Sequence, residues 1–228
     1  MLVSLLALGF LLGLKHALEA DHIAAVTSLV TRSASLRETI RVSGAWGIGH
    51  AATMIVFGTV LILLGATLPD SVALALEAAV GIMLIVLGVD VLRRLSRKQI
   101  HLHAHAHGHG VSHIHVHMHE REPSRHEHAH AAALWPRALI VGCMHGLAGT
   151  AGLVLLALPT MKSGVSALGY LFVFGTGTVF GMILFSLVIS VPLAMSVKRL
   201  RWAAYTLEAL VGTANVVLGG WIAIRSLS

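Results

Sequence analysis

The segment from residue 15 to residue 22 concentrates side chains that can bind a cation inside an otherwise apolar run. His16, Asp21 and His22 place two imidazoles and a carboxylate within seven residues. Such groups are credible ligands for a divalent first-row transition metal. An ion pair between Lys15 and Glu19, one helical turn apart, would explain those two residues but not the other three. We therefore interpret the other three as candidate metal ligands.

Two further histidines lie within apolar runs of the chain. His22 and His50 each lie about eight residues from the same end of their runs, so their depths in a membrane would match. We therefore interpret His50 as a further candidate ligand. His145 holds the place in the second half of the chain that His16 holds in the first. It could act as a ligand or as a hydrogen-bonding partner.

Helical geometry limits how His16, Asp21 and His22 could bind one ion. At about 100° per residue, His22 lies about 120° around a helix from His16, and Asp21 lies about 140° away on the other side. A straight helix cannot aim all three at one metal. Either the helix unwinds between Gly13 and His22, or Asp21 acts on the ligands rather than on the metal. Residues 2–30 as one helix would also reach about 43 Å, so a broken or kinked first helix is predicted.

The composition predicts an all-α polytopic membrane protein. Of 228 residues, 56% are hydrophobic and 11% are charged, whereas a soluble domain carries about 25% charged residues. Apolar runs long enough to cross a bilayer predict six transmembrane helices. These lie at 2–30, 42–64, 71–92, 134–158, 167–193 and 202–224. The single cysteine, Cys143, excludes an internal disulfide and a thiol redox pair.

Basic residues are distributed unequally between the links that join these runs. Twelve Lys and Arg residues lie in the links after the first, third and fifth runs, against two on the other side. Cytoplasmic links carry the excess of Lys and Arg in membrane proteins. We therefore expect a multi-pass protein of the cell (inner) membrane with both termini outside. The same distribution explains the high pI without nucleic acid as a partner.

Residues 93–133 differ from the rest of the chain and are expected to form a cytoplasmic, His-rich, disordered loop. Such a tract cannot build a packed core, and its imidazoles favour loose metal binding. A solvated linker that happens to be rich in histidine is the alternative. The predicted low-affinity metal-binding residues are His101, His103, His105, His107, His109, His113, His115, His117 and His119.

The two halves of the chain repeat each other. Residues 13–18 align with residues 142–147, and Glu77-Ala78 aligns with Glu208-Ala209. The repeats cover 1–92 and 134–228, with three helices in each. Because three is an odd number, the halves must be inverted relative to each other. Inverted repeats are typical of secondary transporters, whose binding sites lie near the bilayer midplane.

Three motifs resemble those of the nickel/cobalt transporter (NiCoT) family. They are His16-Ala17-Leu18-Glu19-Ala20-Asp21-His22, Gly49-His50-Ala51-Ala52-Thr53 and Gly142-Cys143-Met144-His145-Gly146-Leu147-Ala148-Gly149-Thr150. The third is similar to the UreH-like (urease accessory protein-like) transmembrane branch of that family. The resemblance implies Ni²⁺ or Co²⁺ as substrate, and His16, Asp21, His22 and His50 as residues of the metal path.

These observations together predict a secondary transporter that takes up Ni²⁺ and/or Co²⁺. It would be no enzyme and would need no cofactor. The metal, the bilayer and cytoplasmic nickel acceptor proteins would be its partners. The chain contains no phosphate-binding GxxxxGK[ST] loop for a built-in ATPase. Three alternatives stay open: metal efflux by the same fold, a haem-binding electron carrier, and a membrane metal sensor or metallochaperone that does not transport.

Overall fold

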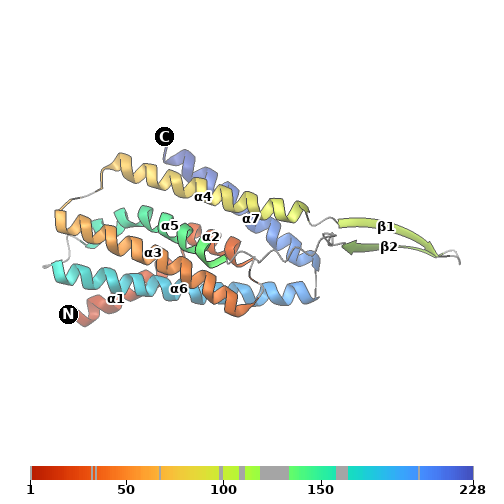
Figure 1. Ribbon diagram of the computed structural model, residues 1–228, viewed down its shortest axis with the longest axis horizontal. Coiled ribbons are helices and arrows are strands. Elements are labelled where there is room, and N and C mark those ends of the chain that lie inside the picture. The colour runs from red at the N-terminus through yellow and green to blue at the C-terminus, as the bar shows by residue number, and fades with distance from the viewer. Residues whose placement is uncertain are drawn as a thin grey trace.

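The computed structural model describes residues 2–31, 33, 35–66, 68–97, 100–107, 111–118, 134–157, 164–199 and 201–227. Side chains are described for 6–31, 33, 35–66, 68–96, 134–149, 164–191 and 205–227. The elements form one elongated helical bundle, with a two-stranded hairpin projecting from one end (Figure 1).

Seven helices are present in the described part of the chain. They are α1 (Leu2–His16), α2 (Ala20–Val30), α3 (Leu36–Leu64), α4 (Asp70–Arg97), α5 (Leu134–Ala157), α6 (Gly164–Arg199) and α7 (Arg201–Arg225). Both chain ends lie at the end of the bundle away from the hairpin (Figure 1).

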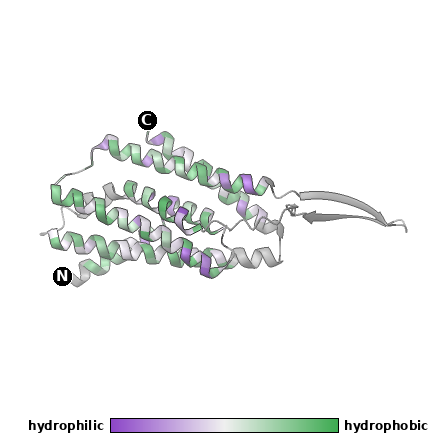
Figure 2. Ribbon diagram, viewed as in Figure 1, coloured by the Kyte–Doolittle hydropathy of each residue, from purple (hydrophilic) through white to green (hydrophobic). Residues whose placement is uncertain are grey.

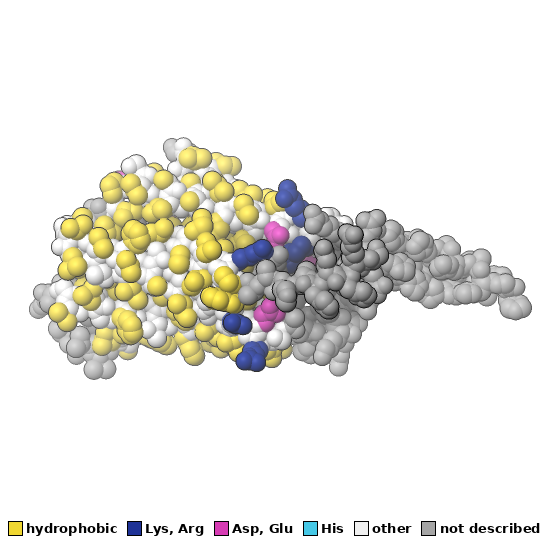
Figure 3. Space-filling view, in the orientation of Figure 1, with side chains coloured by type: hydrophobic (Ala, Val, Ile, Leu, Met, Phe, Trp, Pro, Cys, Tyr) yellow, Lys and Arg dark blue, Asp and Glu magenta, His cyan; other side chains and the backbone are white. Residues whose placement is uncertain are grey.

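Four of these helices, α3, α4, α6 and α7, have apolar stretches long enough to cross a membrane. Figure 2 shows hydrophobic residues predominating along the helices. Large apolar side chains face outward, and Val165 is 81% exposed. Figure 3 shows this apolar surface, with Lys and Arg gathered at the end that carries the hairpin. The chain is therefore a helical membrane protein.

The first predicted span is broken, as its length and its histidine spacing indicate. Helix α1 ends at His16, and α2 begins at Ala20. Between them the Leu18 N–H donates to the Lys15 carbonyl, and Glu19 takes an extended conformation with φ −66° and ψ 150°. The two short helices contain 15 and 11 residues. Each is shorter than the roughly 20 residues needed to cross the bilayer.

Helix α2 lies in the middle of the bundle. Ala25, Val26 and Leu29 are at most 5% exposed and belong to the main hydrophobic core. That core also contains Trp46 of α3 and Leu84 of α4. The helix break therefore places residues 16–22 within the interior of the bundle.

Four helix pairs make the most extensive contacts: α3 with α5, α4 with α7, α3 with α6, and α1 with α6. Glycines allow close backbone approach in these pairs. A Cβ at Gly142 of α5 would collide with the carbonyl oxygen of Trp46 in α3, and one at Gly13 of α1 would collide with that of Phe174 in α6. Residues 13 and 142 hold the same place in the two sequence repeats, as do residues 46 and 174. The two contacts are therefore equivalent.

Part of the His-rich segment forms a hairpin where the sequence predicts disorder. Strands β1 (Ile100–His107) and β2 (Val111–Met118) pair in antiparallel register. Histidine alternates with Leu, Ala, Ile or Val along much of both strands, and this period of two suits a strand. The register pairs His101 with His117, His103 with His115, and His105 with His113. His109 and His119 lie outside the described residues.

Candidate metal centre

Four histidines converge in the bundle from four helices. His16 is the last residue of α1, and His22 is the third residue of α2. His50 has fourteen residues of α3 on each side, which places it about 21 Å from either helix end. His145 has eleven residues of α5 before it and twelve after it. The histidines therefore lie at mid-depth.

His16, His22 and His50 form one group with the spacing of a metal site. The Nε2 atoms of His16 and His50 lie 3.3 Å apart. The His22 ring centroid lies 4.4 Å from that of His16 and 4.9 Å from that of His50. One nitrogen from each ring falls within 4.8 Å of the others. Ligand nitrogens held at 2.0–2.1 Å from one ion are themselves about 3 Å apart, so a small contraction would close the site.

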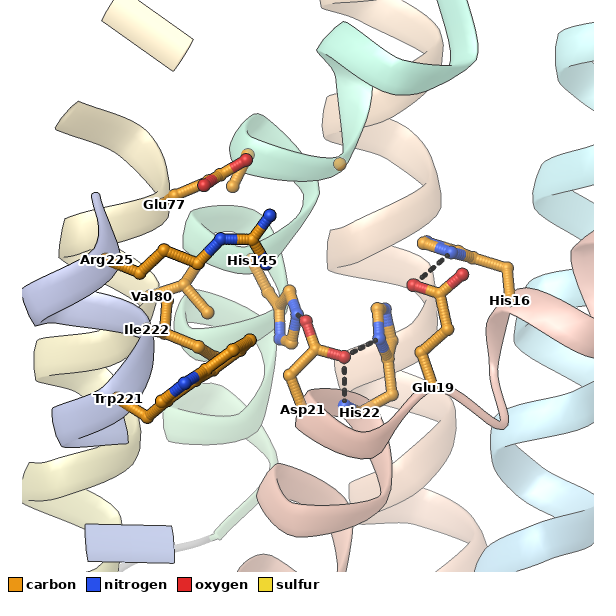
Figure 4. A pocket seen from close by; sticks show the side chains of 12 residues that line it. His16, Glu19, Asp21, His22, Glu77, Val80, His145, Trp221, Ile222 and Arg225 are labelled. Carbon is orange, nitrogen blue, oxygen red and sulfur yellow. Dashed lines mark hydrogen bonds and ion pairs between the residues drawn. The ribbon is translucent and has the colours of Figure 1, made fainter. Parts of the chain in front are cut away.

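Asp21 joins His22 to His145 in a second group (Figure 4). Its Oδ1 accepts the backbone N–H of His22 at 2.9 Å and lies 3.0 Å from Nδ1 of the same residue. Its Oδ2 lies 2.9 Å from Nε2 of His145. A carboxylate beside one ring nitrogen fixes the tautomer and leaves the other nitrogen for a metal. Asp21 therefore directs Nε2 of His22 toward the first group. Both solutions to the helical-geometry constraint are present, because the helix breaks and Asp21 also contacts the histidines.

Three ring nitrogens are buried without a partner. His22, His50 and His145 are at most 2% exposed. Nε2 of His22, Nδ1 of His50 and Nδ1 of His145 have no hydrogen-bond partner among the described residues. A buried polar atom left unsatisfied costs about 1–3 kcal/mol. A bound cation would satisfy such nitrogens directly.

The surroundings of the cluster include residues that the sequence did not single out. Trp46 is fully buried, with its ring centroid 5.7 Å from that of His22 and 5.8 Å from that of His145. Trp46 lies one helical turn before His50, and this spacing is the sequence signal that could have placed it beside the cluster. Glu19, which the sequence paired with Lys15, places Oε2 3.1 Å from Nδ1 of His16. The Trp46 ring therefore forms an apolar wall on one side of the cluster.

A cavity of about 240 Å³ lies beside this cluster. Its wall contains parts of both histidine groups together with residues of α4 and α7 (Figure 4). The lining residues are His16, Glu19, Asp21, His22, Glu77, Val80, His145, Ala148, Gly149, Trp221, Ile222 and Arg225.

The arrangement can hold a divalent cation of borderline softness. Four imidazoles and one carboxylate make up the cluster, and the two possible ligand groups share His22. Imidazole suits Ni, Zn, Cu and Fe, whereas Mg²⁺ and Ca²⁺ prefer oxygen ligands. Two overlapping groups of ligands would let an ion shift between them without leaving the protein.

Comparison with known proteins identifies the relatives of the chain. No family model matches, and no solved structure matches. The chain is 36% identical over 200 residues to the urease accessory protein UreH of Bacillus sp. (strain TB-90), which covers 88% of this chain and 82% of the relative. That relative is named as a urease accessory protein. The chain therefore belongs to the UreH branch of the nickel/cobalt transporter family.

Proposed function

We propose that this protein is a secondary transporter that takes up Ni²⁺ and/or Co²⁺ through the buried histidine cluster. The observation that carries the proposal is the cluster of His16, His22, His50 and His145 at mid-depth in a membrane protein, with Asp21 contacting His22 and His145. Unpaired charged or polar groups are expensive within a membrane and mark ion pathways. The relationship to UreH supports nickel or cobalt as the cargo.

The transport mechanism follows from six spans arranged as two inverted repeats, with α1 and α2 together forming the first span. Equivalent glycine contacts support this symmetry: Gly13 meets Phe174 as Gly142 meets Trp46. Helices α4 and α7, the third span of each repeat, also meet through glycine. Rocking of one repeat against the other would expose the cluster to each side in turn.

The position of the cavity supports uptake. We place the hairpin end in the cytoplasm, because Lys and Arg gather there (Figure 3). The cavity reaches toward the opposite end, where α7 finishes at Arg225. The cluster would thus be open to the outside in this conformation, ready to load metal for import across the inner membrane.

The His-rich segment within 93–133 would bind metal at the cytoplasmic mouth. The register of β1 and β2 pairs three histidines of one strand with three of the other, as His103 with His115. Neutral imidazoles at this density would bind metal loosely. We expect this segment to buffer imported metal before cytoplasmic acceptor proteins collect it.

The test is metal flux into sealed liposomes that contain the purified protein and an internal metal-sensitive dye. The cargoes are Ni²⁺ and Co²⁺, with Mg²⁺ as a control that an imidazole site should reject. The variants are His22→Ala, His113→Ala as a matched loop control, and deletion of 101–130. We expect His22→Ala to abolish flux, His113→Ala to leave it unchanged and the deletion to weaken it.

Other results would redirect the assignment. Tight metal binding without flux would overturn transport and favour a metal sensor or metallochaperone. Flux that persists in His22→Ala would remove the cluster from the path. An optical spectrum of the purified protein would show a haem band if the paired histidines bound haem instead.

A further inference from the structure

We propose that Glu77 and Arg225 form a charged mouth on the cavity, where Glu77 draws a hydrated divalent cation inward and Arg225 opposes it. This inference rests on the proposed function, because it concerns access of the same cargo to the same cluster. It gives roles to two residues that lie outside the histidine motifs.

Both residues line the cavity that contains the metal cluster. Glu77 lies in the second turn of α4, and Arg225 ends α7. The Ser226 hydroxyl donates a long hydrogen bond of 3.4 Å to Oε2 of Glu77, which ties the two helices together at this point. The Arg225 guanidinium lies 5.3 Å from the ring centroid of Trp221, another lining residue.

The cavity leads from these charges to unsatisfied ligand atoms. In the view of Figure 4, the Arg225 guanidinium lies between Glu77 and the His145 ring. His22 and His145 line the cavity, and each has a buried ring nitrogen without a partner among the described residues. A cation that enters at Glu77 therefore shares its space with two of the histidines that hold these nitrogens.

The charges that line the cavity favour a cation. Glu19, Asp21 and Glu77 contribute three carboxylates, and Arg225 contributes one guanidinium. Charges of one sign in a cleft with low-dielectric walls focus the field and accelerate association by 10- to 1,000-fold. Of the lining residues on α4, Glu77 lies nearer the N-terminal end of the helix. A cation that enters from that end would therefore meet Glu77 early.

The sequence repeat shows what is particular to Glu77. Its counterpart, Glu208 of α7, is 8% exposed and is absent from the lining of this cavity. Glu77 is exposed. Equivalent positions in the two repeats thus hold the same residue in different surroundings, and the carboxylate of the first repeat faces the route to the cluster.

The experiment measures how fast Ni²⁺ associates with the full-length protein in detergent. Ni²⁺ quenches tryptophan fluorescence, and Trp46 lies close enough to the cluster to report its occupation. The fluorescence phase that is lost in His22→Ala defines binding at the cluster. The variants are Glu77→Gln, Glu77→Asp, Arg225→Gln and Asp70→Asn. Asp70 is the matched control, because it is an exposed carboxylate on the same helix outside the cavity lining.

We expect Glu77→Gln to slow association about tenfold, with a smaller change in equilibrium affinity. Arg225→Gln should speed association, Glu77→Asp should retain most of the rate, and Asp70→Asn should match the wild type. An association rate in Glu77→Gln equal to that in Asp70→Asn would overturn the inference. So would weaker equilibrium binding with an unchanged association rate, because Glu77 would then support the bound state. The assay needs no flux, so its outcome is separate from that of the transport test.

Discussion

Oδ2 of Asp21 lies 2.9 Å from Nε2 of His145, although 124 residues separate the two in the chain. The other carboxylate oxygen contacts His22 through its backbone N–H and its ring. One side chain therefore connects the broken first helix to the fourth span. The two halves of the chain meet at the histidine cluster through this carboxylate.

Replacing Asp21 with Asn should weaken Ni²⁺ binding by about 10- to 100-fold, the usual effect of losing a carboxylate that orients a histidine ligand. The amide keeps the shape of the side chain, but it has one oxygen acceptor. It therefore cannot accept hydrogen bonds from both His22 and His145, as the two carboxylate oxygens can. Isothermal titration of the purified protein measures the change. Asp90→Asn is the matched control, because Asp90 pairs with Arg94 at 3.3 Å outside the cavity lining. Equal affinities in the two variants would remove Asp21 from the site.

Much of the site could be predicted from the sequence, because chemistry and helical geometry are local. The angular spread of His16, Asp21 and His22 around an ideal helix, together with the length of the first span, predicted a break, and the break occurs at residues 17–19. Apolar length predicted a helical membrane protein. The equal depth of His22 and His50 predicted their approach, and the ring centroids lie 4.9 Å apart.

Other features depended on tertiary packing that a single sequence does not contain. The contact of Glu19 with His16 arises where the helix opens, whereas an intact helix favours Lys15 as its partner. Nothing in the sequence indicated that Glu77 would face the cavity and Glu208 would not. The hairpin was missed because polarity suggested disorder, while the alternation of His with apolar residues suited paired strands.

Adding one methyl group at Gly146 should damage the site through the backbone. A Cβ there would collide with the carbonyl oxygen of His50 and lie 3.0 Å from its Cα. Overpacking of this kind costs about 1–3 kcal/mol. We expect Gly146→Ala to lower the thermal unfolding temperature and weaken Ni²⁺ binding, as measured by thermal denaturation with and without Ni²⁺.

Gly169→Ala is the control for that substitution. Gly169 also lies within a helix, but a Cβ there meets nothing within 4 Å among the described residues. Its unfolding temperature and Ni²⁺ affinity should match those of the wild type. If both alanine variants behave alike, close contact between α3 and α5 is not what holds His50 in place.

Ni²⁺ affinity should fall as the pH falls, because a proton on an imidazole occupies the lone pair that binds the metal. Protonation therefore opposes binding, and the metal-bound form is favoured at higher pH. The histidines of the cluster should therefore hold Ni²⁺ more tightly at pH 7.5 than at lower pH. Equilibrium dialysis at decreasing pH measures the effect. An affinity that rises on acidification would exclude imidazole as the principal ligand.

The most direct test of the buried site is X-ray absorption spectroscopy of Ni²⁺ bound to a protein in which a flexible linker replaces 101–130. This change removes the competing histidines of the loop and leaves the cluster intact. We predict one Ni²⁺ per chain, with at least three nitrogen ligands at about 2.0–2.1 Å, and loss of this site in His22→Ala. Nickel bound through oxygen alone, or a spectrum unchanged by His22→Ala, would contradict a metal path through the histidine cluster.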